Sequence, residues 1–262
     1  MPCPSGRVGS SPTSGIQPPP GPAFAPASLK PMCGRYSLSS PDADLLSRRF
    51  ALGESIEVAD EPRFNIAPTD PVLAVRRGES GRNQLGRLRW GLVPGRWAEK
   101  GGGRPLINAR AETLERQPAF RDSFRERRCL IPADGFYEWL TDDGGKRPLW
   151  FSRPDRELFA FAGIWAELPE RSGDGVLHSC AIVTTEPNGL VRPVHDRMPV
   201  VLVPDAEDAW LDPEAEPGDL RELLVPAPDE MLMAREVGDF VNDVREDGPH
   251  LIAPREEQKS LF

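Results

Sequence analysis

The stretch LKPMCGRYSLSS, residues 29–40, places Cys33 directly after an internal methionine, Met32. If translation begins at Met32, or if residues 1–32 are removed, Cys33 becomes the first residue and carries both a thiol and a free α-amine. Both groups ionise within about two pH units of neutrality, so a useful fraction of each is nucleophilic. An aldehyde forms an imine with the amine of such a 1,2-aminothiol, and the thiolate then closes a thiazolidine ring. Inside a chain the nitrogen is an amide, and Cys33 would be only a small apolar residue.

Charge is spread unevenly along the chain, whose formal net charge is −9. Residues 76–128 hold 14 Lys and Arg against 6 Asp and Glu, a net of +8, whereas residues 205–262 hold 5 against 17, a net of −12. The basic segment contains Trp90 and Trp97, and it is suited to track phosphates and to stack on bases. The alternative is an arginine-rich face that is simply solvated. The acidic total therefore does not exclude a nucleic acid as a partner.

Cysteine and histidine usage argues against a metal site or a disulfide framework. The four cysteines, Cys3, Cys33, Cys129 and Cys180, lie far apart without a C-x-x-C pair, and there are only three histidines. We therefore expect no metal, no cofactor and no disulfide scaffold. The chain also lacks a run of about 18 apolar residues and a secretory signal pattern. This predicts a cytoplasmic, nucleoid-associated protein with no membrane partner.

Short β-like runs dominate the chain after Cys33. The runs are VLAVRR (72–77), LGRLRWGLV (85–93), CLIPADGFYEW (129–139), PLWFS (148–152), LFAFAGIW (158–165), CAIVTTE (180–186) and PVVLVP (199–204). The helical patterns are SPDADLLSRRF (40–50), with Ser40 as its expected N-cap, QPAFRDSFRERR (117–128), PDAEDAWL (204–211) and PGDLRELL (217–224). Their prolines and early acids are typical of helix N-termini.

These patterns predict a strand-rich, single α+β domain over residues 33–254, with mixed or antiparallel sheets forming a barrel-like core and a few flanking short helices. Residues 1–31 contain nine Pro, four Gly and five Ser, so we expect residues 1–32 to be a disordered extension. The extension is either untranslated or removed from the mature protein. Residues 255–262 are expected to form a flexible tail.

Seven motifs follow one another along the chain. They are CGRY (33–36), RFNIAPT (63–69), RWGLVP (89–94), INARAET (107–113), CLIPADGFYEW (129–139), AIVTTEPN (181–188) and VHDRMPVVL (194–202). Together they resemble the SRAP family (SOS-response-associated peptidases), also known as abasic-site processing proteins. In that family the cysteine follows the initiator methionine and, once the methionine is removed, crosslinks the ring-opened sugar of an abasic site in single-stranded DNA. The resemblance covers about residues 33–254.

The resemblance implies catalytic roles for three further residues besides Cys33. Asn108 would hold the reacting sugar carbon and its oxygen by hydrogen bonds, although a turn-capping role is an ordinary alternative for an asparagine. Glu138, between aromatic residues, would transfer protons during sugar ring opening and imine formation; otherwise it lies on the polar face of a strand. His195 would contact the opened sugar and assist imine chemistry, including reversal of the crosslink or strand scission. Its alternative is a structural histidine.

Other motif positions would bind DNA. Arg35, Arg110 and Arg197 offer guanidinium forks to phosphates. Arg110 lies two residues from Asn108, which in a strand places both on one face. Arg197 is open to another interpretation, an ion pair with Asp196 or with a tail carboxylate.

Three motif residues would shape the DNA groove or donate to the site. Pro68 and Trp90 match family positions that line the groove, and Trp90 would stack on a base unless it belongs to the core. Thr184 would donate its hydroxyl within the site, although threonine is also simply a good strand residue.

The predicted function is formation of a covalent, protective crosslink between Cys33 and an abasic site during replication-associated DNA repair, with abasic-site lyase and self-processing peptidase activity implied by the family. One alternative is an N-terminal-nucleophile cysteine amidase or peptidase, which would ignore abasic DNA. The other is a non-catalytic scaffold that binds single-stranded DNA and a replication clamp.

The last five residues, QKSLF (258–262), resemble a short peptide by which bacterial repair proteins dock on the replication sliding clamp. Gln258, Leu261 and Phe262 would be the anchors of such a motif. A frayed terminus without a partner is the alternative.

Overall fold

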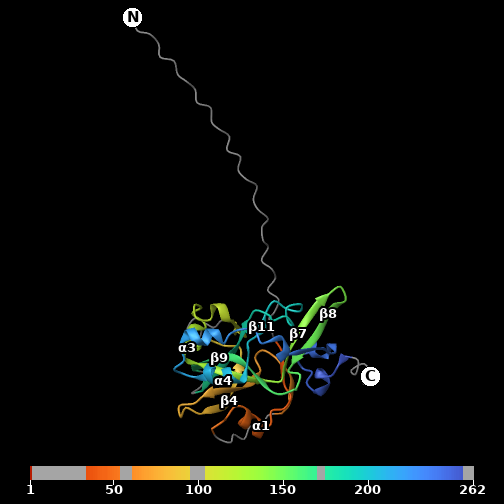
Figure 1. The fold of residues 1–262 in the computed structure, drawn as a ribbon, viewed down its shortest axis with the longest axis horizontal. Coiled ribbons are helices and arrows are strands. Elements are labelled where there is room, and N and C mark those ends of the chain that lie inside the picture. Colours follow the sequence, from red (N-terminus) through yellow and green to blue (C-terminus); the bar gives the residue numbers. More distant parts are fainter. Residues whose placement is uncertain (2–33, 54–60, 95–103, 170–174, 256–262) are drawn as a thin grey trace. The chain divides into compact units, whose positions relative to one another are not determined.

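A five-stranded barrel forms the core of the protein (Figure 1). The computed structural model describes residues 1, 34–53, 61–94, 104–169 and 175–255. The barrel strands, in spatial order, are β10 (Val176–Thr185), β4 (Asn83–Trp90), β3 (Pro71–Arg77), β6 (Arg128–Ala133) and β9 (Phe159–Pro169), and β9 pairs again with β10 to close the ring. Only the contact between β4 and β10 is parallel among these five pairings. The expected barrel-like, strand-rich fold is confirmed.

Short strands extend the barrel at one edge. The strand β5 (Asn108–Arg110) runs parallel to β10, while β11 (Met198–Pro199) runs antiparallel to it and β12 (Val201–Leu202) pairs with β9. Apolar side chains on both faces of the barrel wall, such as Val75 on one face and Ile131 and Phe161 on the other, are fully buried. Successive strand residues face opposite sides of a sheet, so the strand β5 buries Ala109 and leaves Arg110 exposed.

A second sheet has the strand order β13 (Met233–Glu236), β8 (Gly145–Ser152), β7 (Gly135–Asp142), β1 (Tyr36–Leu38) and β2 (Arg63–Ile66). Its hairpin β7–β8 projects beside the C-terminal segment in Figure 1. That segment covers one face of the sheet with Val237, Val241, Leu251 and Ile252, which pack on Tyr137 and Trp150 in a small separate core.

The run CLIPADGFYEW, expected as one β-like segment, divides into β6 and β7 at Asp134. Asp134 is buried, and its carboxylate accepts hydrogen bonds from the Ser37 hydroxyl at 2.6 Å and from the Ser39 N–H at 2.6 Å. At this point the chain leaves the barrel and enters the second sheet. The Asp134 carboxylate stabilises the change of direction, because it accepts hydrogen bonds from groups that strand pairing leaves without an acceptor there.

The helices are short and lie outside the sheets. They are α1 (Ala43–Arg49), α3 (Arg121–Glu126), α4 (Pro204–Leu211) and α5 (Pro217–Glu222), with 3-10 turns η1 (Ala111–Thr113), η2 (Asp229–Met231), η3 (Asp239–Asn242) and η4 (Pro249–Ile252). The N-cap of α1 is Asp42, not Ser40: its carboxylate accepts the Leu45 N–H at 2.8 Å. The helix expected over 117–128 is limited to α3, because Arg128 already belongs to β6.

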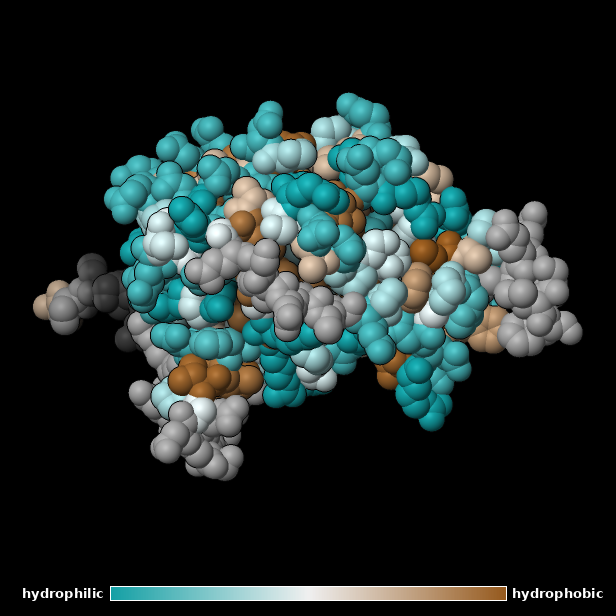
Figure 2. Space-filling model, turned by 90° about the horizontal axis from the view of Figure 1, so that it is seen from below, coloured by the Kyte–Doolittle hydropathy of each residue, from teal (hydrophilic) through white to brown (hydrophobic). Residues whose placement is uncertain are grey.

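None of the helices in the described part of the chain is long and apolar enough to cross a membrane. The face in Figure 2 is mostly hydrophilic, with hydrophobic side chains in small separate patches. The domain boundaries at 32 and 254 stay predictions.

Candidate functional site

The N-terminal strand β1 lies between β2 and β7 and leads toward Glu138. Tyr36 is paired with Phe136, and the Tyr137 N–H donates to the Arg35 carbonyl at 3.0 Å. Continuing this antiparallel register by two residues sets Gly34 opposite Glu138. Glu138 is 2% exposed on β7, so its carboxylate is buried rather than on a solvated strand face. Cys33, the preceding residue, lies outside the described residues.

Arg35 anchors this strand instead of reaching freely toward solvent. Its Nη1 donates to the Asn65 Oδ1 at 2.8 Å and to the Val241 carbonyl at 2.6 Å. Asn65, 2% exposed, in turn donates to the carbonyls of Asp243 at 2.9 Å and Glu246 at 2.8 Å. Burial lowers the pKa of the Arg35 guanidinium. The expected phosphate contact therefore competes with a structural role for Arg35 at the base of β1.

The strands β5, β10 and β11 bring a second group of predicted residues together. Asn108 is paired with Ile182, and Thr184 lies between Arg110 on β5 and Pro199 on β11. Asn108 and Arg110 are alternate residues of a strand, as expected, and Arg110 is exposed at the edge where a phosphate can reach it. Thr184 is fully buried, and its Oγ1 has no hydrogen-bond partner among the described residues.

His195 follows a turn that the Asn188 side chain stabilises by hydrogen bonds, and this turn is joined to β10 by the contact of Arg197 with the Thr184 carbonyl. The Asn188 side chain accepts from the Val191 N–H at 3.0 Å and donates to the Ala227 carbonyl at 3.0 Å, and the His195 N–H donates to the Val191 carbonyl at 3.0 Å. The imidazole side chain is 5% exposed, and the part of the chain that the structure describes offers its Nε2 no hydrogen-bond partner. This ring nitrogen is therefore a buried polar atom that the described residues leave unsatisfied.

Arg197 pairs with Glu112, a partner that the sequence did not suggest; the tail residues 256–262, where an alternative carboxylate partner was expected, lie outside the described residues. Its guanidinium forks onto Glu112 at 2.5 and 3.0 Å and also donates to the Thr184 carbonyl at 2.7 Å. Burial alone would raise the pKa of Glu112, but the hydrogen bonds and charge of Arg197 outweigh it and lower this pKa below its ordinary value. Arg197 is thus already neutralised by a carboxylate beside the site.

Trp90 belongs to the core, and the expected stacking on a base does not fit its burial. The ring is 1% exposed and meets the edge of Tyr36 with centroids 5.4 Å apart. Its Nε1 donates to the Ile107 carbonyl at 2.9 Å, which also accepts from the Ile182 N–H at 3.1 Å. Trp90 therefore connects Tyr36 on β1 with the residue before Asn108, across the two sheets. Trp97, the other tryptophan of the basic segment, lies outside the described residues.

We expect the substitution Trp90→Phe to impair the site without weakening DNA binding. It removes one of two donors to the Ile107 carbonyl, which should cost about 1 kcal/mol of unfolding free energy and loosen Asn108. For the reaction with abasic DNA that the family resemblance implies, the rate should fall about tenfold, because small misplacements of reacting groups are costly. The dissociation constant for undamaged single-stranded DNA should stay within about twofold of wild type. A large rise in that constant with an unchanged reaction rate would instead support base stacking.

Pro68 lies in a tight turn between β2 and β3. The next residue, Thr69, has a φ of 81° and donates its N–H to the Trp90 carbonyl at 2.7 Å. A β-branched residue in this left-handed region is strained, and such strain is typical of functional loops. Pro68 is half-buried beside the exposed Thr69, so the turn presents a rigid surface next to Trp90.

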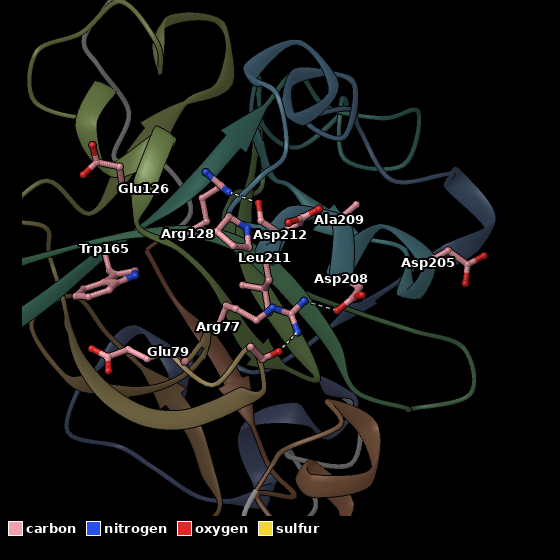
Figure 3. Close-up of a pocket in the computed structure, with 13 residues that line it drawn as sticks. Arg77, Glu79, Glu126, Arg128, Trp165, Asp205, Asp208, Ala209, Leu211 and Asp212 are labelled. Atoms are coloured by element: carbon pink, nitrogen blue, oxygen red, sulfur yellow. Dashed lines mark hydrogen bonds and ion pairs between the residues drawn. The ribbon is translucent and has the colours of Figure 1, made fainter.

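A pocket of about 870 Å³ lies elsewhere, between the β3–β4 turn, α4 and β9 (Figure 3). None of the predicted site residues that the structure describes lines it. Arg77 points to Asp208 and pairs with it at 2.5 Å, while Arg128 donates to the carbonyls of Trp210 and Phe124 at 2.8 Å each. These arginines are occupied by protein groups, so this pocket does not offer them to a phosphate.

No group of three or more His, Cys, Asp or Glu within the described ranges is placed to hold a metal ion. Cys129 and Cys180 are fully buried, and burial raises the pKa of the Cys129 thiol to about 12. Neither thiol is therefore a nucleophile at neutral pH. The anchors of the expected clamp-binding motif, Gln258, Leu261 and Phe262, lie outside the described residues.

Sequence reasoning missed Glu112, Asn188 and Asn65. Each lies inside one of the seven motifs, INARAET, AIVTTEPN and RFNIAPT, so the motifs marked the right segments. The partners of these residues are 85 residues away for Glu112, 39 for Asn188 and 176 or more for the carbonyls bound by Asn65. Spacing along the chain does not reveal contacts at that separation.

Curated relatives share most of this chain. Bacillus subtilis YoqW, named an abasic site processing protein, is 38% identical over 224 residues, which cover 84% of this chain and 99% of the relative. Escherichia coli YedK, with the same descriptive name, is 31% identical over 231 residues, covering 85% and 100%. Chicken (Gallus gallus) HMCES, also so named, is 30% identical over 226 residues, covering 74% and 67%.

Solved structures share the fold. A protein from Bacteroides thetaiotaomicron superposes with a TM-score of 0.73 at 21% identity, covering 85% of this chain and 99% of that chain. A Bordetella bronchiseptica protein superposes with a TM-score of 0.67 at 27% identity, covering 79% and 100%. The family model described as SOS response associated peptidase (SRAP) matches residues 32–244. Because that match spans well over half of the chain, the protein belongs to the SRAP family.

Proposed function

We propose that this protein processes abasic sites in single-stranded DNA during replication-associated repair, and that Cys33 forms the covalent crosslink. The register of β1 against β7, which sets Gly34 opposite Glu138, carries this proposal. A Cys33 α-amine one residue further along would lie close to a buried carboxylate. Relatives that are named for abasic-site processing and cover most of the chain support the same substrate.

The chemistry assigns one role to each group. The α-amine of Cys33 attacks C1′ of the ring-opened sugar and water leaves, giving an imine. The thiolate then adds to the imine carbon, the nitrogen takes up a proton, and a thiazolidine results. Glu138 moves protons to and from the amine and the departing oxygen, while Asn108 holds the reacting carbon and oxygen. The residues 1–32 must be absent for this, because only a free amine can form the imine.

The DNA backbone is held at the β5 edge in this proposal. Arg110 contacts a phosphate flanking the lesion, and the turn that contains Pro68 lies beside the bound DNA strand. Since no base is read, binding should tolerate sequence and weaken with salt. Abasic-site lyase and self-processing peptidase activities would use the same amine, thiol and carboxylate. Docking of QKSLF on a sliding clamp stays a prediction from the sequence.

Intact-mass spectrometry tests the proposal. Protein that begins at Cys33 is incubated with a single-stranded oligonucleotide carrying one abasic site, and with the same oligonucleotide undamaged. We expect a stable adduct only with the abasic strand, at the summed mass less one water. If no adduct forms and peptide or amide substrates are hydrolysed instead, the N-terminal-nucleophile amidase is the correct class.

A further inference from the structure

The imidazole of His195 meets three backbone and side-chain groups at its Nδ1. The Arg197 N–H lies 3.0 Å away and donates to Nδ1 when that nitrogen carries no proton. The Arg197 carbonyl oxygen and the Asp196 Oδ1 each lie 3.2 Å from Nδ1 and would accept from it when it is protonated. Nδ1 is therefore satisfied in both charge states of the ring.

The shortest of these contacts, the Arg197 N–H at 3.0 Å, favours one position of the proton in the neutral ring. If the proton sat on Nδ1, two N–H donors would face one another across 3.0 Å. If it sits on Nε2, Nδ1 accepts the Arg197 N–H without conflict, because each nitrogen of a neutral imidazole is either donor or acceptor. In the charged ring both nitrogens are donors. With the proton on Nε2 in the neutral ring, this nitrogen carries a hydrogen in either charge state and does not act as a general base.

The backbone of Arg197 is positioned by the hydrogen bonds of its own side chain. The Arg197 guanidinium is fixed by Glu112 at 2.5 and 3.0 Å and by the Thr184 carbonyl at 2.7 Å. This ties the backbone of the 195–197 turn to β10 and to η1. Glu112 and Arg197 form a two-point, charge-assisted pair, which has strong geometric specificity.

We propose that Glu112 is a positioning residue that, through Arg197, fixes His195 with its Nε2–H as a hydrogen-bond donor to an oxygen of the bound sugar. The identity of that acceptor rests on the proposed function. The Nε2 of His195 is buried and has no hydrogen-bond partner among the described residues, so a sugar oxygen that accepts from it would satisfy it.

The tautomer can be measured without DNA. Long-range ¹H–¹⁵N spectra of protein labelled at histidine resolve the three rings, and the His195 signals are those lost in His195→Gln. We expect the Nε2–H form in the wild type and a shift toward a mixture of tautomers in Glu112→Gln. Glu115→Gln is the matched control, because Glu115 pairs with Arg221 at 2.7 Å and should leave the His195 signals unchanged. An Nδ1–H ring in the wild type, or a Glu112→Gln spectrum identical to wild type, would overturn the proposal.

Reaction rates provide a second readout. Gln presents an amide N–H near the position of Nε2, so His195→Gln should crosslink within about tenfold of wild type, whereas His195→Asn and His195→Ala should be slower by about 100-fold. Glu112→Gln should lower the rate about tenfold at saturating DNA. His195→Gln as slow as His195→Ala would contradict the donor role. If even the wild type forms no adduct, the proposed function fails, while the tautomer spectra still decide the role of Glu112.

Discussion

Replacing Cys33 with alanine should eliminate the stable DNA adduct while leaving one that borohydride can trap. A chain that begins with alanine keeps its α-amine, so the imine still forms at the sugar C1′. It has no thiolate to add to the imine carbon, and the imine hydrolyses. Ring closure is intramolecular, with effective molarities that reach about 10⁵ M or more, so its loss should bring the stable adduct below detection.

Three proteins make this test decisive: one beginning at Cys33, the same protein with Cys33→Ala, and the full 262-residue chain. The first should give the adduct without reductant, the second only with borohydride, and the third neither unless its extension is removed. Intact mass reports the N-terminus and the adduct in one spectrum. A stable adduct of equal yield in Cys33→Ala would show that another nucleophile reacts.

The local parts of this fold could be predicted from the sequence. The helix α4 has the expected bounds, Pro204–Leu211, because a proline at its first turn and acids behind it define the N-terminus. The runs that became β3, β8 and β9 were recognisable from their apolar and β-branched residues. The strands β1, β2 and β13 were missed, since runs of three or four residues have too little periodicity to stand out.

The long-range parts could not be predicted. Closure of the barrel depends on the parallel pairing of Trp90 with Cys180, and nothing near either residue encodes it. The same holds for the site: motif order proposed Asn108, Glu138 and His195 as candidates, but it did not reveal that Glu112 neutralises Arg197. The sequence left two roles possible for Trp90, a core residue or a base-stacking residue, because a tryptophan suits both. Only its contacts with Tyr36 and the Ile107 carbonyl decide in favour of the core.

The second large effect should come from Gly135→Ala, which inserts one methyl group where β7 crosses Trp150. A Cβ on Gly135 would lie 2.2 Å from the Trp150 Nε1 and 2.3 Å from its Cε2. The indole cannot easily move, because its Nε1 donates to the Ser37 hydroxyl at 3.0 Å and the Arg156 guanidinium lies 4.4 Å from its ring centroid. Overpacking of this kind costs about 1–3 kcal/mol, and losing the buried hydrogen bond adds about 1–3 kcal/mol.

We therefore expect Gly135→Ala to lower the free energy of unfolding by about 2–6 kcal/mol in urea denaturation, a loss that can unfold a marginally stable domain. Gly218→Ala is the matched control: in α5 its new methyl would meet only the end of the Arg221 side chain at 3.9 Å, so the change should be neutral or slightly stabilising. Equal midpoints for the two variants would contradict the packing around Trp150. Because Gly135 is paired with Ser37 and lies three residues before Glu138, any protein that stays folded must shift β7 against β1. Its crosslinking rate should then fall together with its stability, whereas Gly218→Ala should react as the wild type does.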